Sequence, residues 1–84
     1  MNKKLFVGSL PWGVDDAQLA QMFSQAGTVV SAQVVKDRDT GRSRGFGFVE
    51  MSTEEEAQNA VNNLNGTDVD GRKIVVNIAR PREN

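Results

Sequence analysis

The feature of this sequence that most restricts its fold is a strand–helix–strand pattern that occurs twice. Alternating apolar residues predict four strands, over 4–8, 29–36, 44–51 and 72–79. Apolar residues at helical spacing predict two helices, from Asp15 to about Ala26 and from Thr53 to the Asn65-Gly66 pair. The order βαββαβ predicts an α+β fold, a ferredoxin-like sandwich in which two helices cover one face of a four-stranded antiparallel sheet.

Polar residues mark where the two helices begin. Asp15 and Gln18, and then Thr53 and Glu56, have the spacing of a capping box, in which two side chains satisfy the free N–H groups of the first turn. The acidic residues of the second box therefore have a structural role at the positive end of a helix dipole. This reading is preferred to a catalytic carboxylate cluster.

The second and last strands carry further expectations. In the second strand, Val30, Ala32 and Val34 alternate with Ser31, Gln33 and Val35, which predicts that the first three share one face. The pair Asp70-Gly71 is a strong turn signal. One continuous strand, from Arg72 to about Ala79, is expected after it.

The octapeptide over 44–51, RGFGFVEM, belongs to the third predicted strand. Successive side chains of a strand point to opposite faces, so Phe46 and Phe48 share one face and Val49 and Met51 share the other. If Val49 and Met51 are buried, both rings face solvent. Exposed rings are a surface on which flat ligands such as nucleotide bases stack.

A third ring and a cation are expected beside this pair. The first and third strands are neighbours at the centre of the sheet in this topology, so Phe6 is expected next to the two rings. Arg44 shares their face by the same alternation and supplies a positive charge at the edge. A single exposed Phe would be incidental surface or a dimer contact, but three convergent rings favour base stacking.

Composition removes several classes of function. The chain has 84 residues without Cys or His, which closes disulfide and thiolate chemistry and removes the commonest general base and metal ligand. We therefore expect no enzyme activity, cofactor or metal. The length predicts one domain over 1–84, with a core over about 4–79 and a short flexible tail over 80–84. Without a signal segment or an apolar run of about 18 residues, a cytoplasmic protein that does not enter a membrane is expected.

The charge of the chain is nearly balanced, although nucleic-acid-binding modules are usually basic. There are 10 Lys and Arg residues against 11 Asp and Glu residues. The acidic residues gather where helices begin, whereas the cations flank the predicted strands. We therefore expect a sheet with a basic rim and a modest affinity for nucleic acid that weakens with salt.

The octapeptide resembles the ribonucleoprotein octamer of the RNA recognition motif family, K/R-G-F/Y-G/A-F-V-x-F/Y, at every specified position but the last. Residues 5–10, LFVGSL, resemble the hexamer motif of the same family on the first strand. Met51 replaces the usual final aromatic residue, but it faces the core, where Met fills space well. Ser9 stands where the hexamer commonly has Asn, and it is expected to loosen the following turn.

The resemblance implies a role for each matching residue. Phe6 and one ring of the octapeptide would stack on successive bases, the remaining ring would pack against ribose, and Arg44 would pair with a phosphate. Outward residues of the outer strands, with the backbone near Ala79 and Arg80, would contact base edges, and Arg82 would close over the RNA. The implied RNA-binding residues are Phe6, Phe46, Phe48, Arg44, Gln33, Val35, Val75, Asn77, Arg80 and Arg82.

These features favour a non-catalytic module, monomeric and ribonucleoprotein-like, that binds single-stranded RNA with micromolar affinity over about two to four nucleotides. Two alternatives remain: single-stranded DNA binding, and a protein-interaction module that uses the same fold. Acyl phosphate hydrolysis, which some ferredoxin-like sandwiches support, is disfavoured because the loop over 9–13 is apolar and lacks Arg. Trp12 in this loop is expected to pack over the start of the first helix rather than to contact RNA, which is the alternative for it.

Overall fold

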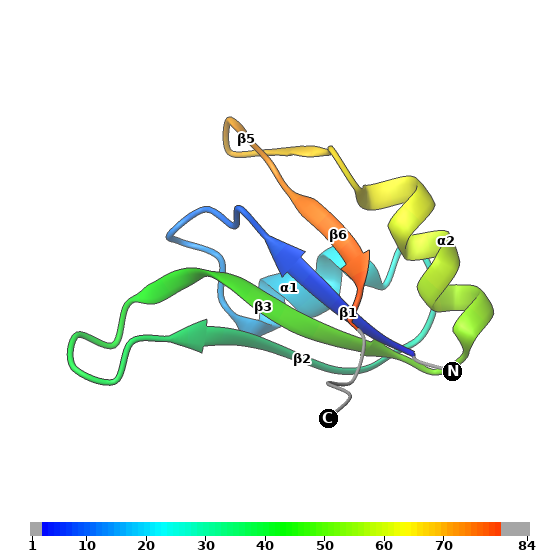
Figure 1. Cartoon of the computed structure of the whole chain (residues 1–84), viewed down its shortest axis with the longest axis horizontal. Helices are drawn as coiled ribbons and strands as arrows, with labels where there is room; N and C mark the ends of the chain where they lie inside the picture. The colour runs from blue at the N-terminus through cyan, green and yellow to red at the C-terminus, as the bar shows by residue number, and fades with distance from the viewer. Residues whose placement is uncertain (1–2, 80–84) are drawn as a thin grey trace, which may run out of the picture.

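A computed structural model describes residues 3–79, apart from the side chain of Ser43. The tail expected over 80–84, including Arg80 and Arg82, lies outside the described residues. The elements follow the order β1 (Lys4–Gly8), α1 (Asp16–Phe23), β2 (Val29–Lys36), β3 (Ser43–Met51), α2 (Glu54–Leu64), β4 (Asp68–Val69), β5 (Arg72–Lys73) and β6 (Val75–Ile78) (Figure 1).

Four of the strands form one antiparallel sheet in the order β2-β3-β1-β6. The two central strands are therefore β1 and β3, and Phe6 of β1 lies opposite Phe48 of β3 in the register. In Figure 1, α1 lies behind these strands. The predicted ferredoxin-like fold and the predicted central pair of strands are confirmed.

The core lies between the sheet and the two helices. Leu5, Val7, Val49 and Met51 are fully buried, whereas Phe6 between the first two is only half-buried. Both helices bury their apolar residues in the same cluster as these strand residues, so both cover the same face of the sheet. Met51, which replaces the final aromatic residue of the octamer, is fully buried. As expected, this replacement affects the core and not the open face of the sheet.

The first helix begins as predicted and ends earlier. The Asp15 carboxylate accepts the Gln18 N–H at 2.8 Å, and the Gln18 side chain accepts the Asp15 N–H at 3.3 Å, which completes a capping box. The last helical residue is Phe23 rather than a residue near Ala26. A tight turn, in which the Ala26 N–H donates to the Phe23 carbonyl at 3.0 Å, replaces the final helical turn.

The second helix is tied to a distant turn through Glu56. The Thr53 hydroxyl accepts the Glu56 N–H at 3.1 Å, which is the first half of the predicted capping box. The second half does not form among the described residues, because the Glu56 carboxylate bonds elsewhere. The Glu56 carboxylate in turn accepts hydrogen bonds from the Ser52 hydroxyl and, at 2.7 Å, from the Thr28 N–H just before β2. These bonds, that of Ser52 first, lower the pKa of Glu56 below its ordinary value because they favour the charged carboxylate.

We expect Glu56→Gln to lower the free energy of unfolding at neutral pH. We also expect the stability of this variant to depend less on pH in the acid range. The folded-state pKa lies below the unfolded one, so the stabilisation is present above the ordinary value of 4.5 and is lost as the pH falls through the folded pKa. Denaturant unfolding of the wild type and of Glu56→Gln across this pH range should show that the difference between their free energies of unfolding becomes smaller as the pH falls. Glu55→Gln removes one negative charge from the same helical turn but none of these hydrogen bonds. If it lowered the stability equally, the loss in Glu56→Gln would come from the helix dipole and not from the hydrogen bonds of Glu56.

The prediction that Val30 shares one face of its strand with Ala32 and Val34 is wrong. Val29 pairs with Met51 and Ser31 pairs with the preceding residue, Glu50, so β2 holds one extra residue at this point. Such a bulge turns the extra side chain away from the regular alternation. Val29 therefore packs against the core, and Val30 is 59% exposed.

The last predicted strand is divided in two. Asp70 and Gly71 have φ of 50° and 84°, the positive values that a tight hairpin turn requires, and they join β4 to β5 in a separate two-stranded sheet. The chain leaves this hairpin at Ile74, whose N–H donates to the Thr67 carbonyl at 3.0 Å. The prediction of one strand from Arg72 to Ala79 therefore holds only for β6.

The turn after β1 contains a strained residue. Ser9 has φ of 57°, in the left-handed region that costs most residues about 1–2 kcal/mol and that Asn tolerates better. We expect Ser9→Asn to raise the free energy of unfolding by about 0.5–1 kcal/mol in denaturant titrations. Ser9→Ala keeps a Cβ without the amide and should bring no such gain. If Ser9→Ala raised the free energy of unfolding as much as Ser9→Asn, relief of backbone strain would not be the cause of the gain.

Candidate functional site

Three aromatic rings meet on the open face of the sheet. The centroid of Phe6 lies 5.8 Å from that of Phe46 and 5.9 Å from that of Phe48, and the last two are 6.3 Å apart. The planes of Phe46 and Phe48 are nearly perpendicular, at 89°. We call these three residues the ring platform. All three rings are half-buried by their packing on one another and on the strands beneath.

Two glycines place the rings of the platform. A Cβ at Gly47, between the two Phe residues of β3, would lie 2.5 Å from the Gln33 carbonyl oxygen and 3.1 Å from the Val34 Cα. Strands β2 and β3 therefore approach each other more closely here than any side chain would allow, as expected for a Gly beside Phe in a strand. A Cβ at Gly8 would lie 2.9 Å from the Phe6 ring, which leans over that residue.

The cation at the platform is Lys4. Its Nζ lies 5.0 Å from the ring centroid of Phe48, within cation–π range. Sequence reasoning placed Lys4 on the rim but did not assign it to the rings. The signal was present, because Lys4 stands two residues before Phe6 and alternation puts both on one face.

Arg44, which the octamer assigns to phosphate, lies at the start of β3 and is exposed. Gly45 has φ of 86°, and the pairing with β2 is irregular here: Val34 pairs with Gly47, whereas Lys36 pairs with Ser43. Because of this irregularity, alternation alone does not assign Arg44 to the face of Phe46, and its place beside the rings stays a prediction.

The outward residues of the outer strands flank the platform on both sides. Gln33 of β2 lies opposite Phe48, and Asn77 of β6 lies opposite Phe6. Both are exposed, Val35 is half-buried, and Val75 is 39% exposed. The structure therefore brings Gln33, Asn77 and Val75 next to the rings, the last because Val75 pairs with Gly8 under the Phe6 ring. Val35 has no partner in the register, and Arg80 and Arg82 lie outside the described residues.

Trp12 does not pack over the helix as predicted, because the residue is 65% exposed. The Val14 N–H donates to the Pro11 carbonyl at 3.2 Å, which closes a tight turn with Trp12 and Gly13 at its tip. Pro11 and Val14 take the buried positions of the loop, so Trp12 is left outside.

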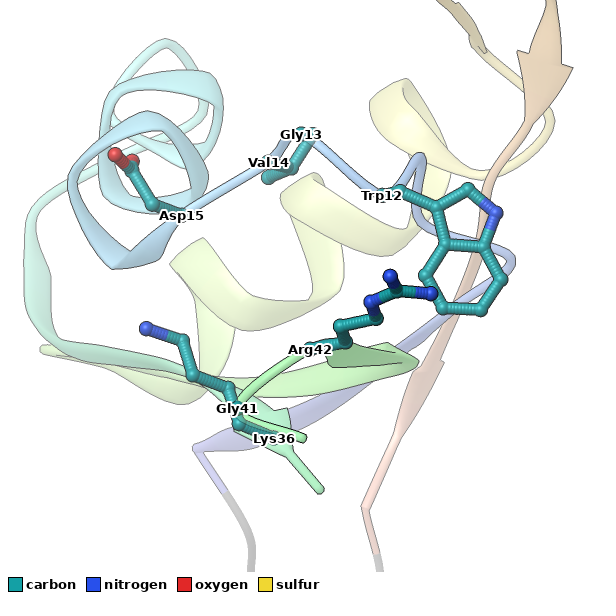
Figure 2. Close-up of a pocket in the computed structure, with 7 residues that line it drawn as sticks. All are labelled: Trp12, Gly13, Val14, Asp15, Lys36, Gly41 and Arg42. Carbon is teal, nitrogen blue, oxygen red and sulfur yellow. The ribbon is translucent and has the colours of Figure 1, made fainter. Parts of the chain in front are cut away.

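Trp12 instead lines a pocket of about 550 Å³ between this loop and the β2–β3 connection (Figure 2). In Figure 2 the Arg42 guanidinium points toward the indole of Trp12, whereas the Lys36 amine lies on the opposite side of the pocket, below Asp15. The pocket is lined by Trp12, Gly13, Val14, Asp15, Lys36, Gly41 and Arg42.

Comparison with known sequences gives a consistent result. The model of the RNA recognition motif family matches residues 5–75. The chain is 58% identical over 79 residues to a 31 kDa chloroplastic ribonucleoprotein of Nicotiana sylvestris, covering 94% of this chain and 25% of the relative. It is 52% identical over 82 residues to the mitochondrial glycine-rich RNA-binding protein 4 of Arabidopsis thaliana, covering 98% and 60%. The chain thus spans about a quarter of the first relative and less than two thirds of the second.

Solved structures resemble the fold along nearly the whole chain. The crystal structure of RNA-binding protein PG1 is 43% identical and superimposes with a TM-score of 0.90, over 98% of this chain and 99% of that one. The sex-lethal protein in complex with RNA is 32% identical with a TM-score of 0.92, over 99% of this chain and 50% of that one.

The names of the relatives overturn the prediction of a cytoplasmic protein, because these relatives are chloroplastic or mitochondrial proteins. The absence of a recognisable signal within 84 residues was too weak a basis for that prediction. Neither helix in the part of the chain that the structure describes is long and apolar enough to cross a membrane.

Proposed function

The chain belongs to the RNA recognition motif family, and we propose that it is a non-catalytic module that binds single-stranded RNA through the open face of its sheet. The observation that carries this proposal is the ring platform, in which three rings from two strands meet at centroid distances of 5.8–6.3 Å. A base stacked on an aromatic side chain contributes about 1–3 kcal/mol to binding. The relatives named as ribonucleoproteins and the neighbour solved with RNA support the same function.

In this proposal the platform and its edges divide the work of binding. Phe6 and one ring of β3 stack on successive bases, while the remaining ring packs against ribose. Lys4, already 5.0 Å from the Phe48 centroid, and Arg44 attract phosphates. The side chains beside the rings contact base edges and set a mild sequence preference. These edge residues are Gln33, Val35, Val75 and Asn77, with Arg80 and Arg82 following them in the chain.

A titration against labelled single-stranded RNA of eight nucleotides, followed by fluorescence anisotropy, tests the proposal. We expect saturable binding with a micromolar dissociation constant that weakens as salt rises, because phosphate contacts release counterions. Duplex RNA of the same sequence should bind less well, because its bases are stacked and cannot reach the rings. An absence of saturable binding to single-stranded RNA would contradict the proposed function.

The choice between RNA and DNA needs its own measurement. Base stacking does not depend on the sugar, whereas contacts to the 2′-hydroxyl distinguish the two nucleic acids. We propose RNA as the partner, and the same titration with single-stranded DNA of equal length provides the comparison. If the affinities for single-stranded RNA and DNA were equal, the rings could still stack on bases, but RNA would not be the specific partner.

A further inference from the structure

The sheet ends on β2 at one side and on β6 at the other, and in the part of the chain that the structure describes each of these strands pairs with one other strand only. The outer edge of such a strand offers backbone N–H and C=O groups to a strand of another molecule. We propose that the Asp16 carboxylate keeps the chain monomeric by closing the outer edge of β2 to strand addition by a second copy. This inference goes beyond RNA binding and does not depend on it.

Asp16 reaches the edge of β2 from the start of α1. Its carboxylate accepts the Val34 N–H at 2.7 Å, although the two residues are 18 apart in the sequence. Val34 pairs with Gly47 of β3, so an N–H group that donates to α1 points away from β3. Because N–H groups of an antiparallel strand alternate between its two sides, the Ala32 N–H points to the same outer side. A hydrogen bond to a carboxylate is stronger than one to a neutral carbonyl, so an incoming strand would have to displace the stronger bond.

The edge of β2 has room for another strand. A groove of about 730 Å³ lies between α1 and β2, and small side chains such as Ala17, Ala20 and Ala32 form part of its lining. Val30, which is 59% exposed, adds apolar surface to the same groove. The pairing of β2 with β3 is regular only over 31–34, between two irregularities, and Asp16 binds within this regular part. The groove leaves this part of the edge accessible, so the hydrogen bond of Asp16 is the barrier to strand addition.

The opposite edge of the sheet is closed by the chain itself. Where the chain enters β6, the Gly66 N–H donates to the Ile74 carbonyl at 2.8 Å and the Ile74 N–H donates to the Thr67 carbonyl at 3.0 Å. The Asn65 side chain accepts the Val76 N–H at 3.0 Å. The segment after α2 therefore covers the outer edge at the start of β6, which is a common protection of edge strands. A second copy should accordingly add to β2 rather than to β6 when the carboxylate on β2 is removed.

Sedimentation velocity of the wild type and of Asp16→Ala, each over a wide range of protein concentrations, tests the proposal. We expect the wild type to sediment as a monomer at every concentration. Asp16→Ala leaves the N–H of the buried Val34 without its acceptor, and a carbonyl group of a second copy can satisfy it. The mean mass of this variant should therefore rise toward twice that of the wild type as its concentration increases.

Two control variants separate the edge of β2 from a general loss of stability. Asp15→Ala removes a carboxylate from the same helix start and breaks the capping bond to Gln18, but it leaves the bond of Asp16 in place, so it should stay monomeric. Asp16→Asn keeps a side-chain oxygen that accepts the Val34 N–H and should also stay monomeric. Circular dichroism checks the folding of each variant. If Asp16→Ala is unfolded, sucrose, which stabilises folded states, is added to all four proteins alike.

The contacts of the dimer are located by the amide signals in NMR spectra of Asp16→Ala recorded at several dilutions. Signals of β2 should shift with concentration and signals of β6 should not. The proposal fails if folded Asp16→Ala stays monomeric, if the wild type itself forms dimers, or if the shifts lie away from β2. It also fails if Asp15→Ala or Asp16→Asn associates as strongly as Asp16→Ala, because the hydrogen bond to Val34 would then not be the cause. These measurements contain no RNA, so each of these failures leaves the proposed function untouched.

Discussion

Replacing both Phe46 and Phe48 with Ala is expected to reduce the affinity for single-stranded RNA by a factor of about thirty or more. The β3 ring that stacks on a base contributes about 1–3 kcal/mol, and the loss of the ring that packs against ribose adds to it, so the binding free energy falls by about 2 kcal/mol or more. The fold should survive, because the buried residues of β3, Val49 and Met51, lie on the other face. Anisotropy titrations of both proteins measure the change.

The controls for this result keep either the rings or the charge. Phe46→Tyr with Phe48→Tyr preserves the stacking surface and should bind nearly as well as the wild type. Lys4→Gln removes the cation beside Phe48 and should cause a smaller loss that depends on salt. If the double Ala variant binds RNA with unchanged affinity, the platform is not the binding surface.

Replacing Gly47 with Ala is expected to lower the free energy of unfolding by about 2–3 kcal/mol. The new methyl group would lie 2.5 Å from the Gln33 carbonyl oxygen and 3.1 Å from the Val34 Cα. Both neighbouring atoms belong to the backbone of β2, so relief requires the two strands to separate rather than a side chain to rotate. Denaturant unfolding measures the change.

Gly13→Ala is the matched control, because a Cβ at Gly13 meets nothing within 4 Å. This variant should stay within about 0.5 kcal/mol of the wild type, as substitutions away from packed groups usually do. Because Gly47 lies between two platform residues, Gly47→Ala should also weaken RNA binding when measured under conditions where it is folded. Equal stabilities of the two variants would show that β2 can move away without cost.

Much of the fold could be predicted because local and global patterns agree in this chain. The alternation through Leu5, Phe6 and Val7 assigns one ring to the open face, and the alternation of β3 assigns two more. The topology then brings these rings together, and Met51 is buried as its position predicts. The helix caps were also readable, since they depend on residues only three apart.

What could not be predicted depends on backbone irregularity and on contacts between distant segments. The bulge that exposes Val30 changes the register by one residue, and no local composition marks it. Trp12 was expected to be packed, but a four-residue turn buries its neighbours Pro11 and Val14 instead. The hydrogen bond from the Thr28 N–H to Glu56 joins residues 28 apart, beyond the reach of any capping pattern.

The mutual contacts of the three platform rings have a consequence for the kinetics of binding. Because Phe6, Phe46 and Phe48 already restrict one another's rotamers in the free protein, little side-chain ordering remains for the moment when RNA arrives. Encounter rates should therefore be similar for RNAs of the same length and charge. Differences in affinity between sequences should appear mainly in the lifetime of the complex, which is set by how well each base fits the rings.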